Sequence, residues 1–129
     1  MKTLIVDDDF VNRLLIQEML KAYGTSHIAV NGKEAVDAVR RAIESFEPYD
    51  LICLDVMMPE MNGQQALREI RALEKSKGVK QRTKIVMTTA LADPENVTEA
   101  LQGECDYFLA KPIRKAALLD ALRRVAVIP

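Results

Sequence analysis

The chain has 129 residues, the length of a single domain that can bury a core without disulfides or bound metal. Apolar residues make up 49% of the sequence and charged residues 29%, which excludes a disordered chain, a collagen-like repeat and a disulfide scaffold. Because 18 basic and 19 acidic residues leave a formal charge of −1, we expect no direct binding to nucleic acid or to an anionic membrane.

Five short apolar segments are predicted to form strands, at residues 3–6, 26–30, 51–54, 84–87 and 107–110. The first, third and fourth segments show no polar alternation, which is typical of strands covered on both faces. In the second segment Ile28 and Val30 alternate with His27 and Ala29, which predicts an edge strand with one face in water.

Segments with helical spacing of apolar residues separate these strands. Gly24 is predicted to end the first helix, and Asn31 and Asn62 to begin the second and third. Asp93, followed by proline, is predicted to begin a fourth helix, and the fifth is expected over residues 114–125. The inward-facing positions are predicted to be Val11, Leu14, Leu15, Ile16, Met19 and Ala22; Ala35, Val36, Val39, Ile43 and Phe46; Ala66, Leu67, Ile70 and Leu73; and Leu118, Leu119, Leu122 and Val125.

Strands that alternate with helices in this way predict an α/β sandwich around a mostly parallel sheet. Right-handed crossovers restrict such a sheet to a few strand orders. The basic stretch at residues 74–84 is expected to be a solvated loop. In an open parallel sheet the functional site lies at the carboxyl ends of the strands, so the residues that follow each strand are the candidates for function.

Acidic, hydroxyl and basic side chains follow the predicted strands. They are Asp7, Asp8 and Asp9 after the first strand, Asp55 after the third, Thr88 and Thr89 after the fourth, and Lys111 after the fifth. Taken singly, each has an ordinary explanation; Asp9 is expected to cap the first helix, and Asp8 to favour its positive end. Taken together, they are predicted to converge on one rim of the sheet.

Carboxylates that lie within a few ångströms of one another repel, so a proton or a cation must be present among them. Oxygen ligands suit Mg²⁺, which is commonly held by one or two carboxylates, water and a phosphate oxygen. A carboxylate beside such an ion can attack a phosphoryl group and form an acyl phosphate, while a nearby ammonium neutralises charge on the transferred group. The rim therefore carries the groups needed to make and hold an aspartyl phosphate.

The sequence resembles the receiver domains of response regulators in two-component signalling. Four segments match in the family's order and spacing across essentially the whole chain: LIVDDDF, DLICLDVMMPEMNG, IVMTTA and YFLAKPI. The resemblance implies a flavodoxin-like (βα)5 fold, a doubly wound parallel sheet with strand order 2-1-3-4-5. It assigns residues 1–129 to one receiver domain that acts as a phosphorylation-dependent switch.

Carried over by position, the resemblance makes Asp55 the acceptor of the phosphoryl group. Asp7 and Asp8 match the acidic pair that holds Mg²⁺, together with Asp55 and the backbone carbonyl of Met57. Lys111 would pair with a phosphoryl oxygen. The chain would then catalyse only its own phosphorylation and dephosphorylation and would not be an enzyme for other substrates.

The same resemblance implies a switch in which Thr89 hydrogen-bonds the phosphoryl group and an aromatic side chain, here Phe108, turns inward. Phe108 has no hydroxyl to fix its rotamer. The peptide bond before Pro112 is expected to be cis. Met57 and Leu91 stand where relatives often carry polar side chains, and we expect these two to shield the phosphoryl group and lengthen its lifetime.

The resemblance implies a histidine kinase or a histidine phosphotransfer protein as the phosphoryl donor. Surface residues of the first helix are expected to select this partner, for example Asn12, Leu14, Leu15 and Glu18.

Only a stub follows the last predicted helix, so we expect no output domain, no direct contact with nucleic acid, and signalling through a downstream protein target that the sequence does not identify. The face at residues 118–125 offers a surface for a homodimer on phosphorylation. Met1, directly before the first strand, favours a free-standing protein over an excised receiver of a hybrid kinase.

Three other functions agree with parts of the sequence. A phosphatase of the haloacid-dehalogenase type would use Asp7 as nucleophile and Asp9 as acid, but it would leave Asp55 without a role. A flavin-binding protein of this fold would hold the flavin phosphate where three aspartates would repel it. A receiver-like adaptor that is never phosphorylated is the third. His27, the lone histidine, is expected to be a surface residue with no part in the mechanism.

Cys53 and Cys105 lie in apolar runs and form no CxxC pair, which predicts two buried thiols in a reducing compartment. The sequence starts without a secretory leader, and no apolar stretch approaches the roughly 20 residues that span a bilayer. A cytoplasmic protein without a membrane contact is therefore expected.

Overall fold

The computed structural model describes residues 1–90 and 105–129, so Leu91 and the helix predicted to begin at Asp93 lie outside the described residues. The strands are β1 (Lys2–Val6), β2 (Thr25–Ala29), β3 (Leu51–Asp55), β4 (Lys84–Thr89) and β5 (Tyr107–Ala110). The helices are α1 (Phe10–Leu20), α2 (Gly32–Glu44), α3 (Gly63–Ser76) and α5 (Lys115–Arg124), with a 3-10 turn, η1, at Lys21–Tyr23.

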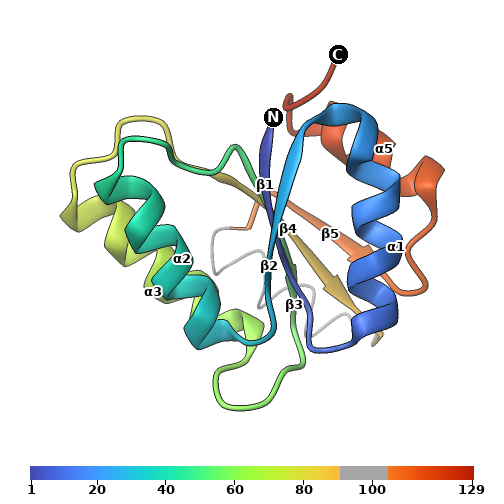
Figure 1. The fold of residues 1–129 in the computed structure, drawn as a ribbon, viewed down its shortest axis with the longest axis horizontal. Coiled ribbons are helices and arrows are strands. Elements are labelled where there is room, and N and C mark those ends of the chain that lie inside the picture. The colour runs from blue at the N-terminus through green and yellow to red at the C-terminus, as the bar shows by residue number, and fades with distance from the viewer. Residues whose placement is uncertain (91–104) are drawn as a thin grey trace.

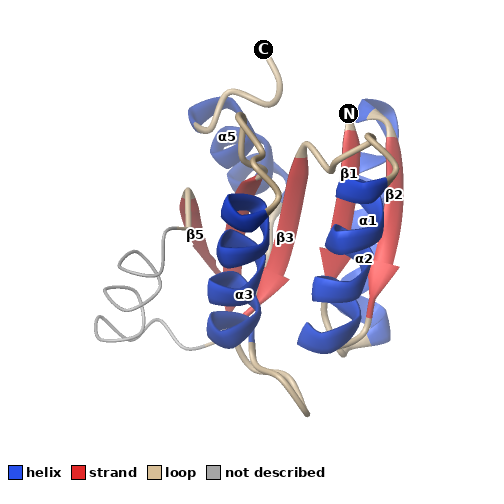
Figure 2. Ribbon diagram, turned by 90° about the vertical axis from the view of Figure 1, so that its left-hand side faces the viewer, coloured by secondary structure: helices blue, strands red, loops and turns tan. Residues whose placement is uncertain are grey.

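All five strands are parallel and form one sheet in the order β2-β1-β3-β4-β5 (Figure 1). This order confirms the predicted flavodoxin-like fold. The helices cover both faces: α1 and α5 lie on one side of the sheet, and α2 and α3 lie on the other (Figures 1 and 2).

Two apolar cores lie on the two faces of the sheet. Along β1, Leu4 packs into the core beneath α2 and α3, and its neighbour Ile5 packs into the core beneath α1 and α5. Cys53 belongs to the second core and Cys105 to the first, and both are buried free thiols, as predicted. Because successive strand residues point to opposite faces, apolar runs without alternation are what a sheet covered on both sides requires.

Side-chain caps begin three of the helices where the sequence predicts them. The Asp9 carboxylate accepts a hydrogen bond from the backbone N–H of Val11 (2.8 Å) at the start of α1. Asn31 caps α2, and Asn62 forms a reciprocal capping box with Gln65 at the start of α3. These caps satisfy N–H groups that the first helical turn leaves without partners.

The apolar stripe predicted for the first helix is wrong in part. Ile16 and Leu20 are buried, but Leu14 and Leu15 are 46% and 50% exposed, and Val11 is exposed as well. A helix turns by about 100° per residue, so Leu14 points about 200° away from Ile16. One helix face cannot bury all these side chains, and α1 presents an apolar surface to solvent.

Three further apolar positions, in two segments, differ from the prediction. α2 ends at Glu44, and Phe46 beyond it has a positive φ of 60° and is 92% exposed. β2 is an edge strand as predicted, but Ala29 is its buried residue, and Ile28 and Val30 are exposed. The buried face of this strand therefore carries Ala29, and the apolar side chains of Ile28 and Val30 lie on the solvent side.

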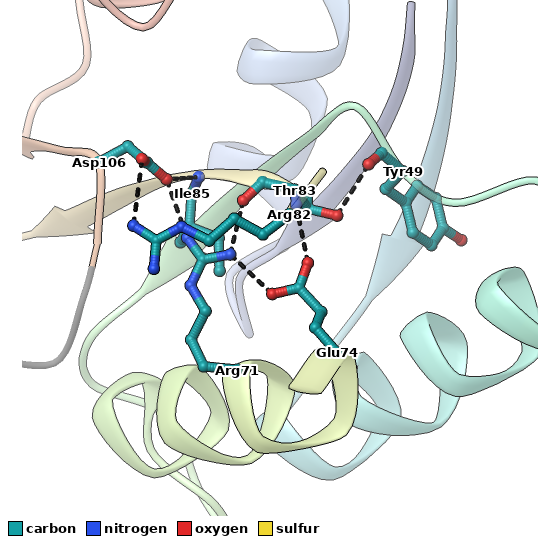
Figure 3. A network of polar contacts seen from close by, with 7 residues as sticks. All are labelled: Tyr49, Arg71, Glu74, Arg82, Thr83, Ile85 and Asp106. Carbon is teal, nitrogen blue, oxygen red and sulfur yellow. Dashed lines mark hydrogen bonds and ion pairs between the residues drawn. The ribbon is translucent and has the colours of Figure 1, made fainter. Parts of the chain in front are cut away.

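Residues 74–84 do not form a single solvated loop, because α3 extends to Ser76 and a buried ion-pair network anchors both ends of the stretch (Figure 3). Arg71 contacts Glu74 (2.8 Å) and Asp106 (2.9 Å) and donates to the Thr83 carbonyl (2.7 Å). The Thr83 N–H donates to Glu74 at 2.7 Å. These contacts join α3 to the beginnings of β4 and β5, so the network fixes the end of the sheet opposite the rim.

Candidate functional site

The carboxyl ends of four strands bring the candidate residues to one rim. Asp7 directly follows β1, Asp55 is the last residue of β3, Thr89 is the last residue of β4, and Lys111 directly follows β5. The strand register places Asp55 beside Thr88. The parallel topology therefore assembles groups that are far apart in the sequence.

Asp7 is almost fully buried, at 1% exposure, and it has a hydrogen bond to each carboxylate oxygen. Its Oδ1 accepts from the backbone N–H of Asp9 (2.9 Å), and its Oδ2 accepts from the Lys111 ammonium (2.9 Å). The Arg13 guanidinium donates to its backbone carbonyl (2.9 Å). Asp8, in contrast, is exposed beside the positive end of α1.

The Asp55 carboxylate is also buried, at 3% exposure, beside one opposite and one like charge. Its Oδ2 lies 3.3 Å from the Lys111 Nζ, and its Oδ1 accepts a long hydrogen bond (3.4 Å) from the Met57 N–H. Burial and the charge of Asp7 raise the pKa of Asp55 to about 6, and Lys111 only partly offsets them. A further positive charge beside Asp55, from a proton or a metal ion, would therefore stabilise the site.

Lys111 joins the two buried carboxylates. Burial lowers the pKa of its ammonium, but the hydrogen bond to Asp7 and the charges of Asp55 and Asp7 outweigh burial, so the pKa is raised. Lys111 therefore remains a cation at neutral pH. Its backbone N–H donates to the Thr89 carbonyl (2.6 Å), and the following peptide bond, to Pro112, is cis as predicted.

Three acidic side chains are arranged so that they can hold a cation. Asp7, Asp8 and Asp55 each offer a carboxylate oxygen, and these oxygens lie within 4.8 Å of one another. Two of the carboxylates are buried, and an all-oxygen set of this kind fits a hard divalent ion such as Mg²⁺. The donor chemistry and the crowding of negative charge both agree with the magnesium site expected from the sequence.

The remaining predicted residues differ in their burial. Thr89 is fully buried at the end of β4, Phe108 is partly buried against the core beneath α2 and α3, and the Met57 side chain is exposed. Leu91 lies outside the described residues. The structure thus brings Asp7, Asp8, Asp55, Thr89 and Lys111 to one rim and leaves the shielding role of Leu91 untested.

Gly63 positions the acceptor loop, a role that the sequence analysis missed. A Cβ atom at this position would overlap the backbone carbonyl oxygen of Asp55, and the Gly63 N–H donates to the Val56 carbonyl (2.9 Å). The Val56 N–H in turn donates to the Thr88 carbonyl (2.9 Å). The first residue of α3 therefore packs directly on Asp55, and its place in the segment ending MNG was the available signal.

Comparison with known families identifies the family to which this fold belongs. The profile of the response regulator receiver domain matches residues 3–123. The chain belongs to this family. As a receiver domain it is a signalling module of two-component systems, and the phosphatase and flavin-protein alternatives are set aside.

Relatives of the chain include receiver segments within much longer signalling proteins. The chain is 37% identical over 128 residues to the sensory/regulatory protein RpfC of Xanthomonas campestris pv. campestris, covering 98% of the chain and 17% of the relative. It is 35% identical to the osmosensing histidine protein kinase SLN1 of Saccharomyces cerevisiae, covering 94% of the chain and 10% of that kinase. The chain therefore spans less than a fifth of these relatives.

Solved receiver structures share the fold. The receiver domain of the histidine kinase CKI1 from Arabidopsis thaliana, solved as a mutant, superposes with a TM-score of 0.86 at 32% identity, covering 96% of this chain and 88% of that one. The receiver domain of the sensor histidine kinase PA1611 from Pseudomonas aeruginosa, crystallised with magnesium in its active site cleft, superposes with a TM-score of 0.79 at 32% identity, covering 96% of both chains.

Among the described residues, no helix is long and apolar enough to cross a bilayer.

Proposed function

We propose that the receiver domain accepts a phosphoryl group on Asp55 from a phosphohistidine of a histidine kinase or histidine phosphotransfer protein. The observation that carries this proposal is the position of the buried Asp55 carboxylate, 3.3 Å from the Lys111 ammonium and within the cluster formed with Asp7 and Asp8. Such a geometry offers a nucleophile next to groups that neutralise an incoming phosphoryl group.

In the proposed step, a carboxylate oxygen of Asp55 attacks the phosphorus atom and forms an acyl phosphate. The phosphorus–nitrogen bond of the donor breaks, and its electron pair returns to the imidazole nitrogen, which takes up a proton. Lys111 then pairs with a phosphoryl oxygen, and the Thr89 hydroxyl donates a hydrogen bond to another. The ionised carboxylate is the nucleophile, and the positive charge of Lys111 favours this ionised form.

Mg²⁺ would be held by carboxylate oxygens of Asp7, Asp8 and Asp55 and by the backbone carbonyl of Met57. When bound, the ion supplies positive charge that offsets the repulsion between these carboxylates and the phosphoryl oxygens. The buried pair of Asp7 and Asp55 already shares the single ammonium of Lys111. This one positive charge leaves the three carboxylates with a net negative charge, which supports the need for a second cation.

Acetyl phosphate with Mg²⁺ tests the assignment of Asp55. The wild-type chain is expected to gain a phosphoryl group that is labile in base, and Asp55→Asn is expected to lose it. Asp9→Asn is a matched control, because Asp9 caps α1 outside the carboxylate cluster and asparagine caps helices equally well. Labelling of Asp55→Asn at the wild-type level would refute the proposal, and an unlabelled wild type would favour the adaptor alternative.

The exposed surface of α1 is the proposed docking site for the phosphohistidine partner. Phe10, Val11, Leu14 and Leu15 are exposed on this helix, which begins beside Asp8 at the rim. Leu15→Glu is expected to slow transfer from a phosphorylated kinase and to leave labelling by acetyl phosphate unchanged. Phe46→Glu is the control, since Phe46 is an exposed apolar residue at the opposite end of the sheet. Equal effects of both variants would contradict this docking site.

We also propose that Met57 and Leu91 lengthen the life of the acyl phosphate by restricting water. The Met57 side chain is exposed beside the acceptor, where it can cover a bound phosphoryl group. The double variant Met57→Asn, Leu91→Glu is expected to lose its phosphoryl group faster than wild type. An unchanged or longer lifetime would discard the shielding role. The output of the switch is proposed to be contact with a further protein.

A further inference from the structure

A second cluster of polar side chains lies at the opposite end of the sheet from the rim. It lines a cavity of about 360 Å³ between the start of β1, the edge strand β2, α2 and the loop before β3. At about 30 Å³ per water, this is the volume of about a dozen water molecules, enough for a small organic molecule. Four apolar residues also line it: Leu4, Ile28, Ala38 and Ala42.

Two cations line the cavity without a carboxylate partner. Within the described part of the chain, neither the Lys2 ammonium nor the Arg41 guanidinium forms an ion pair. In contrast, the neighbouring Arg40 on α2 pairs with Asp37 at 2.9 Å. Glu47 is the single acidic residue of the lining, so the cavity wall carries a net positive charge even with His27 neutral.

The position of the Lys2 ammonium is fixed by two contacts. Its Nζ donates to the backbone carbonyl of Glu47 (2.6 Å) and lies 4.6 Å from the centre of the Tyr49 ring. Tyr49 is buried, and its own carbonyl accepts from the Thr83 hydroxyl (2.8 Å), so the loop that carries it is joined to the Arg71 network. Figure 3 shows the Tyr49 ring directed away from that network. The ammonium is therefore held by a rigid part of the fold.

A third donor comes from the lone histidine. The Tyr49 hydroxyl lies 2.8 Å from the His27 Nδ1, and the two rings meet edge to face. Burial raises the pKa of the Tyr49 hydroxyl, with Arg41 opposing this rise, so the hydroxyl keeps its proton and can donate to Nδ1. When Nδ1 accepts this hydrogen bond, the imidazole proton resides on Nε2, which is then available as a donor. The Ser45 hydroxyl also lines the cavity, although it donates to the Arg41 carbonyl (2.8 Å).

We propose that this cavity binds a small organic phosphate, with the phosphoryl oxygens held by Lys2, Arg41 and His27 and the organic group resting on the apolar lining. Two unpaired cations and a neutral N–H donor suit a dianionic head group better than a single carboxylate. The apolar wall beside them favours an ester over inorganic phosphate. The site is separate from the rim and does not depend on the chemistry proposed for Asp55.

Nuclear magnetic resonance of the single histidine provides a direct test. Phenyl phosphate is added to the intact chain with a chelator present, so that no metal-dependent reaction occurs at Asp55. The ring signals of His27 are expected to shift along a saturable binding curve. Benzoate and inorganic phosphate are expected to bind with lower affinity than phenyl phosphate. Unshifted His27 signals would overturn the proposal. Equal affinity for benzoate would refute the choice of a phosphate, and equal affinity for inorganic phosphate would refute the apolar contact.

Adjacent arginines of α2 supply a matched pair of variants. Arg41→Gln is expected to weaken binding of phenyl phosphate about fivefold, the loss of about 1 kcal/mol that an exposed charged contact contributes. Arg40→Gln removes the same charge one residue away, where Arg40 pairs with Asp37, and is expected to leave the affinity unchanged. Equal weakening by both variants would show unspecific attraction to positive charge and would overturn the site. Urea unfolding of both variants verifies that each retains the fold.

Discussion

Replacing the acceptor with its neutral analogue, Asp55→Asn, is expected to stabilise the metal-free protein at neutral and basic pH. In the folded chain the pKa of Asp55 is raised from 3.8 to about 6, first by burial and then by the charge of Asp7. Ionisation of this carboxyl therefore opposes folding. Asparagine has a similar shape and cannot ionise, so the variant avoids this cost.

The size of the effect follows from proton linkage. Between pH 3.8 and about 6 the folded state binds more protons at Asp55 than the unfolded state, so the free energy of unfolding falls as the pH rises through this window. A difference of about two pKa units corresponds to roughly 3 kcal/mol, at about 1.4 kcal/mol per unit. The free energy of unfolding of Asp55→Asn should thus exceed that of wild type by about 3 kcal/mol at pH 8 and by almost nothing at pH 4.

Urea unfolding followed by circular dichroism at pH 4, 5, 6 and 8, in the presence of a chelator, measures this difference. Asp8→Asn is the control: Asp8 belongs to the same cluster but is exposed, so its replacement should change stability by less than about 0.5 kcal/mol. A gain for Asp55→Asn that is equal at pH 4 and pH 8 would refute ionisation as the cause. A loss at pH 8 would show that the attraction to Lys111 outweighs burial.

Three further variants or treatments test other parts of the fold. Arg71→Met leaves the buried Glu74 carboxylate without its cation and removes one of the two cations that contact Asp106, so it should lower the free energy of unfolding by about 3–5 kcal/mol in urea, whereas Arg40→Met should lower it by less than about 0.5 kcal/mol. Gly63→Ala places a methyl group against the backbone carbonyl oxygen of Asp55. It should lower the free energy of unfolding by about 1–3 kcal/mol and slow labelling by acetyl phosphate. Wild-type stability together with a wild-type labelling rate would contradict the close packing. Burial raises the pKa of Cys53 to about 12 and of Cys105 to about 11, so a disulfide reagent should label both thiols far more slowly in the native protein than in urea.

The residues alone were sufficient to predict a parallel sheet and the grouping at the rim, and the resemblance to receiver domains supplied the strand order. Runs without alternation require a sheet covered on both faces, and a parallel sheet brings Asp7, Asp55, Thr89 and Lys111 to the same edge whatever the details of packing. Helix starts were also predictable, because the caps Asp9 and Asn62 act through hydrogen bonds to the next few residues. Local chemistry and chain topology fix these features.

Features that depend on contacts between distant segments were not predictable. Glu74 looks like one charge in a basic loop; its ion pair with Arg71 is local to α3, but the hydrogen bond from the Thr83 backbone N–H that helps to make its burial favourable exists only in the folded chain. Similarly, periodicity identifies the apolar residues of α1 but does not show that Leu14 and Leu15 exceed the arc that the sheet can cover. The overlap of Gly63 with the acceptor backbone also exists only in the folded chain.

Gly32 connects the first turn of α2 to the loop that follows Asp55. Its amide donates to the Met61 carbonyl (3.1 Å), and the lack of a side chain lets the first turn of α2 lie against the loop that follows Asp55. When that loop departs from its resting position, this hydrogen bond breaks and the amide proton becomes free to exchange with solvent. The exchange rate of a single backbone proton on a neighbouring helix therefore provides an intrinsic gauge of how often the acceptor loop opens.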